Sequence, residues 1–271
     1  MPARTLAELR AVVRAGPPYD EGFLRGLAED VRAGARALHR ECLRRIAAAE
    51  KEAERAAAML RFENEAREAG HQRVAGVDEA GRGPLAGPLV AAAVVLGEPV
   101  PGLNDSKQLK PSERERLFEL LHRPGHDLAV GVAQAETIDF QGIQSANYHA
   151  MELAVQELDP APDCVLVDGF LLPSCPIRQV RIRGGDRLSM SIAAASIVAK
   201  VTRDRLMVEL EKNYPGYGFA RNKGYPTAEH VAALRTLGPC PAHRRSFAPV
   251  AAAVRQHGAG HSVCGDLKDT V

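Results

Sequence analysis

The stretch Arg73-Val74-Ala75-Gly76-Val77-Asp78-Glu79-Ala80-Gly81-Arg82-Gly83-Pro84 marks the point at which the character of this 271-residue chain changes. An apolar run ends on two adjacent carboxylates, a Gly-Arg-Gly-Pro turn follows, and a second apolar run covers residues 89–96. The pattern predicts two strands joined by a turn. Carboxylates attract divalent cations, and glycines leave backbone N–H groups open to a phosphate or a sugar. The stretch therefore predicts a corner that holds a metal and a nucleic-acid strand, with a solvated strand end as the plain alternative.

Composition limits the class of protein without identifying its partner. Hydrophobic residues make up 45% of the chain and charged residues 25%, which is typical of a soluble globular protein. The formal net charge of +1 means that any nucleic-acid contact must come from local clusters of Arg and Lys. Five cysteines without a CxxC pair favour a reduced, cytoplasmic setting. The N-terminus lacks the apolar core of a signal peptide, and no apolar run approaches the ~18 residues of a membrane span.

The first 70 residues predict a helical extension. Residues 6–68 are rich in Ala, Arg, Glu and Leu, with few breakers apart from Gly16-Pro17-Pro18. A stripe of apolar residues at three- and four-residue steps predicts one helix face, formed by Leu24, Leu27, Val31, Ala35 and Leu38. A longer helix is expected over residues 46–60. The extension is interpreted as a solvated helical hairpin, with a nucleic-acid-gripping role for its arginines as the alternative.

From residue 71 onward the pattern predicts an α/β domain that reaches residue 250. The expected strands cover residues 73–78, 89–96, 127–135, 164–169 and 177–182, and the expected helices cover 112–122, 145–158, 189–213 and 228–237. The first three strands predict an antiparallel meander, and the later alternation of strand and helix indicates parallel strands. Small residues in the first turns of the helix at 189–213 predict a close approach to the sheet. Residues 251–271 are expected to form a disordered tail.

Four acids lie next to glycine at predicted strand ends: Asp78, Glu79, Asp168 and Asp186. Strand ends of an α/β sheet converge in space, so these carboxylates are expected to form one cluster. Mutual repulsion makes such a cluster unstable without cations, and all-oxygen ligation favours Mg²⁺ or Mn²⁺. Two such ions can activate a water and stabilise the leaving oxygen of a phosphodiester. Taken singly, Asp168 or Asp186 could instead cap a turn or helix, and Asp186 could cap the helix that begins near Leu188.

Competing catalytic templates are weaker. The chain contains no GxxxxGK[ST], HExxH or GxSxG motif. Residues 81–86 fit a loose dinucleotide fingerprint, but a predicted strand follows where that fold requires a helix. Metal-dependent phosphodiester chemistry is the hypothesis that remains.

The region from Arg73 to Val250 resembles the bacterial ribonuclease HII family of the ribonuclease H-like superfamily. The blocks that carry the resemblance are Asp78-Glu79-Ala80-Gly81-Arg82-Gly83-Pro84, Asn104-Asp105-Ser106-Lys107, Val167-Asp168-Gly169, Gly185-Asp186, Ala194-Ala195-Ser196-Ile197-Val198-Ala199-Lys200-Val201-Thr202-Arg203-Asp204, Asn222-Lys223-Gly224-Tyr225-Pro226-Thr227 and His243-Arg244-Arg245-Ser246-Phe247. The resemblance implies a ribonuclease H-like mixed sheet flanked by helices. It also implies cleavage of the RNA strand of RNA/DNA hybrids and cutting 5′ of single ribonucleotides in duplex DNA, which leaves a 3′-hydroxyl and a 5′-phosphate.

The resemblance also implies roles for individual residues. Asp78, Glu79, Asp168 and Asp186 match the family's four metal-binding carboxylates, which would hold two Mn²⁺ or Mg²⁺ ions. The turn of Gly81, Arg82 and Gly83 matches the loop that recognises the ribose 2′-hydroxyl. Tyr225 matches the tyrosine that packs against the sugar at the RNA-to-DNA junction, with a half-buried loop aromatic as the alternative.

Basic residues in the matching blocks are candidate phosphate contacts: Lys107, Lys200, Arg203 and Lys223. Lys200 could instead pair with Asp204, and Arg203 could simply be solvated. His230 and His243 are interpreted as structural, because metal-assisted hydrolysis by carboxylates needs no imidazole.

Arg82 distinguishes the chain from the sister ribonuclease HIII family, which usually has another residue between the two glycines. The expected protein is a cytoplasmic monomer that acts in DNA replication and repair, removing misincorporated ribonucleotides and RNA primers, with no membrane partner. One rival keeps the fold but acts as a DNA nuclease or junction resolvase. The other rival is a catalytically silent nucleic-acid-binding module led by the arginine-rich N-terminal helices.

Overall fold

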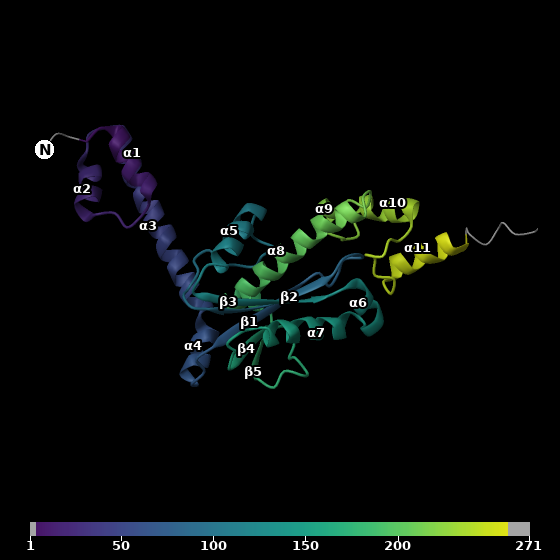
Figure 1. Cartoon of the computed structure of the whole chain (residues 1–271). Helices are drawn as coiled ribbons and strands as arrows, with labels where there is room; N and C mark the ends of the chain where they lie inside the picture. Colours follow the sequence, from purple (N-terminus) through teal and green to yellow (C-terminus); the bar gives the residue numbers. More distant parts are fainter. Residues whose placement is uncertain (1–3, 260–271) are drawn as a thin grey trace, which may run out of the picture. The chain divides into compact units, whose positions relative to one another are not determined.

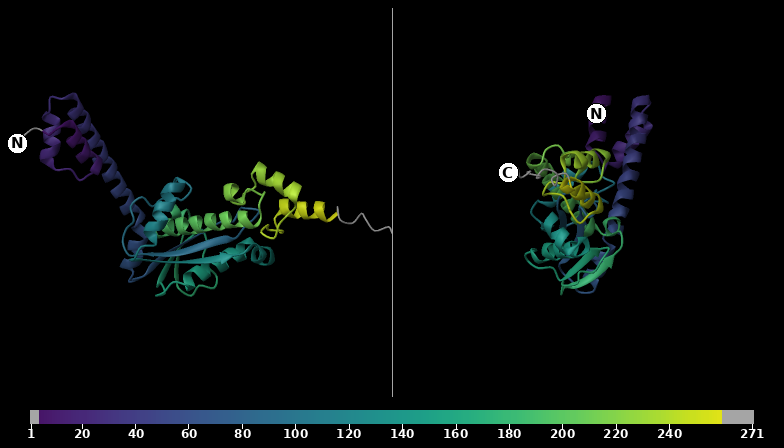
Figure 2. Two further views of the ribbon diagram at one scale, coloured as in Figure 1. Left: turned by 45° about the horizontal axis from the view of Figure 1, so that its top comes forward. Right: turned by 90° about the vertical axis from the view of Figure 1, so that its right-hand side faces the viewer.

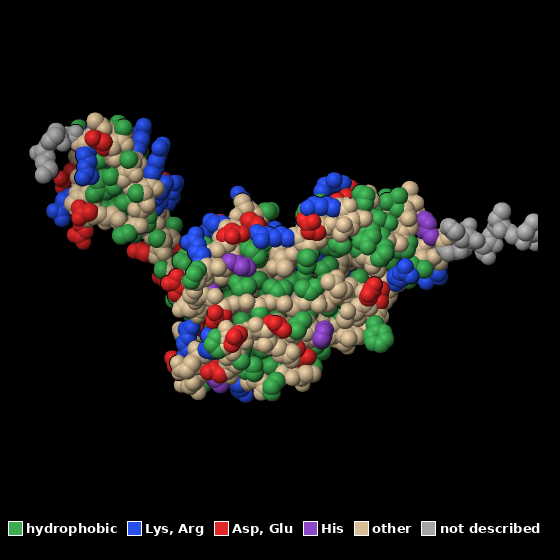
Figure 3. All heavy atoms as spheres, in the orientation of Figure 1, with side chains coloured by type: hydrophobic (Ala, Val, Ile, Leu, Met, Phe, Trp, Pro, Cys, Tyr) green, Lys and Arg blue, Asp and Glu red, His purple; other side chains and the backbone are tan. Residues whose placement is uncertain are grey.

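A computed structural model of the chain describes residues 4–259 and divides between Ala58 and Met59 into two compact units. The N-terminal unit contains α1 (Leu6–Ala15), α2 (Glu21–Glu29) and most of α3 (Ala33–Met59). Its core is formed by Leu9, Val13, Leu27, Ala35 and Cys42. Side chains of both signs lie on these helices in the face that Figure 3 shows. The extension is therefore helical, as predicted.

The predicted apolar stripe from Leu24 to Leu38 does not lie on one helix. α2 ends at Glu29 and α3 begins at Ala33, and Val31 between them is 89% exposed. The Asp30 side chain accepts hydrogen bonds from the backbone N–H and the guanidinium of Arg32, which stabilises a non-helical link. An Asp side chain in a short polar link competes with the helical backbone for hydrogen bonds in this way. The spacing of apolar residues in the sequence therefore continues across the link, although the helix does not.

The second unit is built on a five-stranded mixed sheet with the order β3-β2-β1-β4-β5. The strands are β1 (Val74–Ala80), β2 (Leu89–Leu96), β3 (His126–Ala133), β4 (Cys164–Asp168) and β5 (Arg178–Ile182). β1 and β2 are antiparallel, as are β2 and β3, whereas β4 runs parallel to both β1 and β5. This arrangement confirms the predicted meander followed by parallel strands.

Helices cover both faces of the sheet, with α8 (Met190–Asn213) along one face and α7 (Ile143–Gln156) along the other (Figure 1). The remaining helices of this unit are α4 (Arg61–Glu68), α5 (Pro111–Leu121), α6 (Ala135–Gln141), the 3₁₀ turn η1 (Gly185–Arg187), α9 (Phe219–Asn222), α10 (Ala228–Leu237) and α11 (Ala248–Ala259). Figure 2 shows α10 and α11 beyond the end of α8. Within residues 4–259, no helix is long and apolar enough to cross a membrane.

Close packing of α8 on the sheet depends on small residues, as predicted. A Cβ added at Gly76 of β1 would lie 2.1 Å from the backbone carbon of Ser191, so only glycine allows this approach. The facing turns of α8 are lined by Ala193, Ala194 and Ala195, all fully buried. The acids at the end of β1 are thereby held in a fixed relation to α8.

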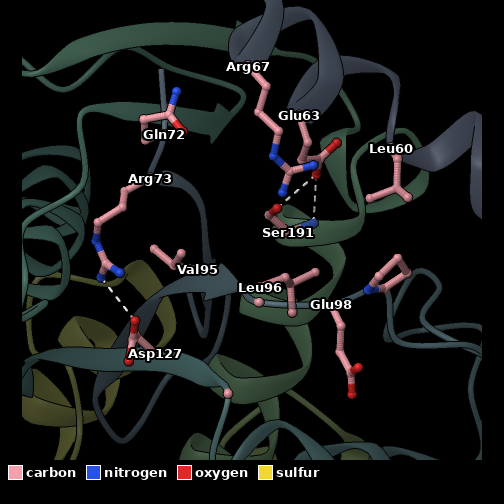
Figure 4. Close-up of a pocket in the computed structure, with 13 residues that line it drawn as sticks. Leu60, Glu63, Arg67, Gln72, Arg73, Val95, Leu96, Glu98, Asp127 and Ser191 are labelled. Carbon is pink, nitrogen blue, oxygen red and sulfur yellow. Dashed lines mark hydrogen bonds and ion pairs between the residues drawn. The ribbon is translucent and has the colours of Figure 1, made fainter. Parts of the chain in front are cut away.

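The first turn of α8 is capped by side chains rather than by Asp186. The Ser189 side chain accepts from the N–H of Ile192. Glu63 of α4, which is only 1% exposed, accepts from both the N–H and the hydroxyl of Ser191 (Figure 4). It also accepts from the Ser189 hydroxyl. A carboxylate suits the positive end of a helix. Asp186 is consequently not required as a cap.

Two predicted boundaries differ from the structure. Packing places the division at Ala58 rather than at Gly70, because α4 contributes Ala66 to the core under β1 and β4. The expected tail at residues 251–271 was wrong over residues 251–259, which belong to α11. Val250 and Ala253 of α11 are buried against Leu85 and Leu234, and these few apolar contacts were too sparse to predict a helix. Residues 260–271 lie outside the described part of the chain.

Candidate active site

The four candidate carboxylates lie at or just beyond the C-terminal ends of three neighbouring parallel strands, β1, β4 and β5. Asp78 and Glu79 are the two residues before the last residue of β1, and Asp168 is the last residue of β4. Val77 pairs with Val167 in the parallel ladder, so Asp78 and Asp168 follow at the same edge. Asp186 lies in η1 just beyond β5, and the N–H of Gly185 donates to Asp168 Oδ1 at 2.8 Å. These four residues are called the acidic site.

Burial and mutual repulsion make the acidic site electrostatically unfavourable by itself. Asp78 is 6% exposed, and burial, followed by the charges of Glu79 and Asp168, raises its pKa well above the ordinary value. Burial also raises the pKa of Glu79, although Arg82, 3.6 Å away, opposes the shift. Burial and the charge of Asp105 raise the pKa of Asp186. Each of these groups would be more readily ionised beside a cation.

The donor set fits a hard divalent cation in its chemistry. Carboxylate oxygens are the ligands that Mg²⁺ and Mn²⁺ prefer, and the repulsion within the site is what a cation relieves. Within residues 4–259, no group of three or more His, Cys, Asp or Glu side chains is already arranged as a coordination shell. The structure therefore brings the acids to one edge of the sheet. Binding of an ion would draw their carboxylates closer together.

Asp105 is a fifth acid at this edge that the sequence analysis did not single out. It is 2% exposed, and Arg187 Nε lies 3.3 Å from its carboxylate. Although burial opposes the effect, the N–H and the charge of Lys107 hold the pKa of Asp105 below its ordinary value. Its loop position, with no strand before it, provided no signal of proximity to Asp186.

The Gly-Arg-Gly turn packs against two buried arginines, and one of them, Arg244, also donates hydrogen bonds to it. Gly81 has φ +99°, and an added Cβ would lie 2.1 Å from Arg203 Nε, so glycine is required there. Arg244 donates to the carbonyl oxygens of Gly81 and Arg82 at 2.6 and 3.0 Å. The Arg82 side chain donates to Gln144 Oε1 at 2.7 Å and lies over the ring of Phe170. The turn is thus fixed both in its backbone and in its central side chain.

A pocket of about 300 Å³ opens beside the turn and shares Glu79 with the acidic site. Its lining combines the glycine turn, hydroxyls, basic residues and one aromatic ring: Glu79, Ala80, Gly81, Arg82, Gly83, Ser106, Lys107, Ser196, Lys200, Arg203 and Tyr225. Tyr225 is 41% exposed, and a Cβ at Gly83 would lie 3.8 Å from its ring. The pocket therefore has a backbone wall and an aromatic wall that face each other.

The four basic candidates differ in their availability. Lys107 is the most exposed, with 83% of its side chain accessible and Nζ 3.9 Å from Asp186. Lys200 pairs with Asp204 at 2.6 Å, as one alternative expected, and Lys223 Nζ lies 3.4 Å from the carbonyl of Asp204. Arg203 is 1% exposed, which rules out the alternative that it is solvated. Its guanidinium donates to the carbonyls of residues 86, 88 and 223, so it braces backbone and presents no free charge.

His230 and His243 form a buried pair with a structural role. Their Nε2 atoms lie 3.1 Å apart. His243 Nδ1 accepts from the N–H of Cys240, and His230 Nδ1 lies 2.9 Å from the carbonyl of Tyr225. With neutral rings, His243 donates to His230, which donates to Tyr225. Burial and the neighbouring His230 lower the pKa of His243 to about 4, which keeps it neutral.

Sequence reasoning missed the groups that support the site, notably Ser196 and Arg244. Ser196 Oγ lies 3.0 Å from Ser106 Oγ, and Ser196 opposes the rise in the pKa of Asp78 that burial causes. Both residues are in the blocks that carry the family resemblance, which was a signal. Their roles depend on partners that are 90 or more residues away in the chain, and only the folded arrangement shows these.

Comparison with known proteins agrees with this geometry. A family model described as Ribonuclease HII matches residues 75–250, and one described as Ribonuclease HII N-terminal domain matches residues 5–67. A protein named ribonuclease HII from Myxococcus xanthus is 50% identical over 249 residues, covering 90% of this chain and 85% of its own. One of the same name from Desulfitobacterium hafniense is 48% identical over 248 residues, covering 91% and 95%.

Two solved structures share the fold. The ribonuclease H2 from Pyrococcus horikoshii OT3 has a TM-score of 0.57 and 28% identity, covering 68% of this chain and 98% of its own. The RNase HII from Archaeoglobus fulgidus, solved in a complex with PCNA, has a TM-score of 0.56 and 25% identity, covering 65% and 95%. The Ribonuclease HII model at residues 75–250 lies within the sheet-containing unit, where the acidic site lies.

Proposed function

The chain belongs to the ribonuclease HII family, and from this membership and the site geometry we propose that it is a metal-dependent endonuclease for ribonucleotides paired with DNA. It hydrolyses the RNA strand of RNA/DNA hybrids and cuts 5′ of a single ribonucleotide in duplex DNA, leaving a 3′-hydroxyl and a 5′-phosphate. Removal of misincorporated ribonucleotides and of RNA primers, by a cytoplasmic monomer, is the role that we assign to this activity.

The observation that carries the proposal is the acidic site beside the Gly-Arg-Gly turn. Asp78, Glu79, Asp168 and Asp186 would hold Mn²⁺ or Mg²⁺, because a cation offsets the burial and the neighbouring negative charges that raise the pKa of Asp78 and of Asp186. When bound, such ions supply Lewis-acid activation of water and charge stabilisation at the leaving oxygen. The protein contributes orientation, because the N–H of Gly185 donates to Asp168 and the N–H of Glu79 donates to Asp78.

Selection of ribose is assigned to the pocket next to the acidic site. Glycine backbone lets N–H groups approach a sugar hydroxyl without interference from a side chain. Tyr225 on the opposite wall provides a surface for the neighbouring sugar. A Cβ at Gly83 would lie 3.8 Å from the ring, so the turn and Tyr225 adjoin each other at the same pocket.

The test uses two duplexes that differ by one 2′-hydroxyl. We expect the full-length protein with Mn²⁺ or Mg²⁺ to cut the ribonucleotide-containing duplex once, at the 5′ side of the ribonucleotide, and to leave the all-DNA duplex intact. End-group analysis should give a 3′-hydroxyl and a 5′-phosphate. Equal cutting of both duplexes would favour a DNA nuclease or junction resolvase, and binding without any cutting would favour a silent binding module.

The variant Asp78→Asn separates catalysis from folding. It keeps the shape of the side chain but removes its charge, so cleavage should fall by more than about a hundredfold while the circular dichroism spectrum is unchanged. Glu157→Gln is the matched control, since Glu157 is an exposed acid after the end of α7. A fully active Asp78→Asn protein would refute the assignment of the metal site.

A further inference from the structure

Arg244 is a buried cation without an acidic hydrogen-bond partner. It is 0% exposed, and its hydrogen bonds end on backbone carbonyl oxygens. Nε and Nη2 donate to Gly87 at 3.0 and 2.9 Å, Nη2 also donates to Gly81, and Nη1 donates to Arg82. Burying a guanidinium is unfavourable unless its donors are satisfied, so such an arrangement is retained at a specific place in the backbone.

The positions of these carbonyls determine the direction of two amides. A trans peptide is planar, and its C=O and N–H point in opposite directions. When Arg244 holds the carbonyls of Gly81 and Arg82, the N–H groups of Arg82 and Gly83 are therefore turned away from Arg244. Neither N–H donates to another group within residues 4–259, and both residues line the 300 Å³ pocket.

The charge on Arg244 also affects the strength of these amides as donors. A hydrogen bond from a cation to a carbonyl draws electron density toward the oxygen, and hydrogen bonds in a chain polarise one another. The N–H on the far side of the same peptide becomes a better donor. Two consecutive peptides are polarised in this way, and both have their amides unused.

We propose that Arg244 is a positioning residue for recognition of the ribose 2′-hydroxyl, acting through the Gly81–Arg82 and Arg82–Gly83 peptides. The inference rests on the proposed function and adds the group that aims and polarises the turn. Arg203 acts differently, because its donors reach the carbonyls of residues 86, 88 and 223 and none in the turn. Arg244 is consequently the buried arginine on which discrimination between ribose and deoxyribose depends.

The experiment measures discrimination separately from overall activity. The full-length wild type and Arg244→Met are assayed on a duplex with one ribonucleotide, with the all-DNA duplex of the same sequence as competitive inhibitor. We expect Arg244→Met to raise KM for the ribonucleotide duplex about tenfold, the size of one hydrogen bond, with a smaller change in kcat. The inhibition constant of the all-DNA duplex should stay within about twofold, because the lost contact exists only with ribose.

Two further variants keep the test decisive. Val155→Ala removes buried methyl groups in α7, on the opposite face of the sheet from α8, so it should lower the melting temperature without changing the ratio of the two constants. Arg244→Lys keeps the charge but not the fork of donors, so its KM should lie between those of the wild type and Arg244→Met. If Arg244→Met does not fold, Arg244→Lys alone decides.

The outcomes separate this inference from the proposed function. The inference is overturned if KM and the inhibition constant rise together, or if neither changes in a folded variant. A wild-type protein that does not cut the ribonucleotide duplex would instead refute the proposed function, whatever the variants do.

Discussion

Two groups of buried charges in the sheet-containing unit differ in how far hydrogen bonds and ion pairs compensate them. The acidic site places carboxylates beside one another, so burial and repulsion raise the pKa of Asp78 and of Asp186. Arg203 and Arg244, together called the arginine brace, are also close enough that burial and Arg203 lower the pKa of Arg244 to about 9. The brace, however, has its donors on carbonyl oxygens, whereas the acidic site has only loose ion pairs in the described residues, from Arg82 to Glu79 at 3.6 Å and from Lys107 to Asp186 at 3.9 Å.

The difference distinguishes a site that is completed by a ligand from a structure that is already complete. Leaving buried like charges near each other costs free energy in the folded state, and a bound cation removes that cost. The arginine brace needs no such partner, because backbone oxygens already accept from it. We therefore expect changes in the acidic site to affect activity more than stability, and changes next to the brace to do the reverse.

The largest expected effect is the loss of cleavage in Asp168→Asn. This carboxylate links the acidic site to η1 through the N–H of Gly185, and Asn preserves the oxygen that accepts this bond. Cleavage of the ribonucleotide duplex should fall by more than about a hundredfold. Stability in EDTA should stay the same or increase, since one repelling charge is removed.

Urea unfolding and steady-state cleavage of the same preparations measure the two effects. Glu157→Gln serves again as the control for loss of one negative charge. The contrast between the two regions would be broken if Asp168→Asn lost stability in proportion to its loss of activity.

The next effect concerns the contact between the turn and the brace. Gly81→Ala places a methyl group at φ +99° and 2.1 Å from Arg203 Nε, so we expect a loss of about 3 kcal/mol in the free energy of unfolding. Gly83→Ala is the matched control, because its Cβ would meet only Tyr225 at 3.8 Å. Its stability should change by less than about 1 kcal/mol.

Cleavage assays complete this comparison. A methyl group at Gly83 takes up space in the pocket next to Tyr225. The Gly83→Ala protein should therefore be stable and yet bind the ribonucleotide duplex more weakly. Equal stability of the two alanine variants would show that the brace does not restrict the turn.

The strands and the acidic site could be predicted because short stretches of sequence carry the patterns that indicate them. The strands β1, β2 and β4 contain apolar runs between breakers, and the runs in β1 and β4 end on acids. Parallel strands bring such ends to one edge of a sheet, which made the acidic site a reasonable prediction. The small residues of α8 likewise indicated its close packing.

The arginine brace could not be predicted, for a physical reason. An Arg in sequence is equally compatible with a phosphate, a carboxylate or a set of carbonyls, and only burial decides between them. Arg203 was therefore expected to contact phosphate, and the structure instead favours a bracing role. Asp105 was overlooked because a loop residue has no register that indicates its neighbours.

The histidine pair extends the comparison to groups that stay buried by remaining neutral. The pKa of His243 is lowered from 6.5 to about 4, so the unfolded chain binds more protons than the folded one between these values. Stability from this group is complete above about pH 6.5 and is lost as the pH falls toward 4. The loss should reach about 3 kcal/mol in the free energy of unfolding.

His243→Gln isolates this contribution. The acids with raised pKa values contribute with the opposite sign over part of the same range, so the useful quantity is the difference between wild type and variant. Urea midpoints at pH 7.5 and pH 5 should converge for the two proteins as the pH falls. A difference that does not depend on pH would show that His243 is not kept neutral by the fold.

The smallest expected effect compares two exposed lysines, one that lines the pocket and one near the C-terminal end of α8. The Lys107 side chain is 83% exposed, and its Nζ lies 3.9 Å from Asp186. Lys212 lies in the last turn of α8 and pairs with Glu209 at 2.8 Å. Lys107→Ala should raise KM about three- to fivefold at low salt and reduce the slope of log KM against log salt by about 1, as loss of one phosphate contact requires. Lys212→Ala should leave both quantities unchanged. Because Arg203 is already satisfied by carbonyls, a wild-type salt slope in Lys107→Ala would mean that Lys200 or Lys223 contacts the phosphate instead.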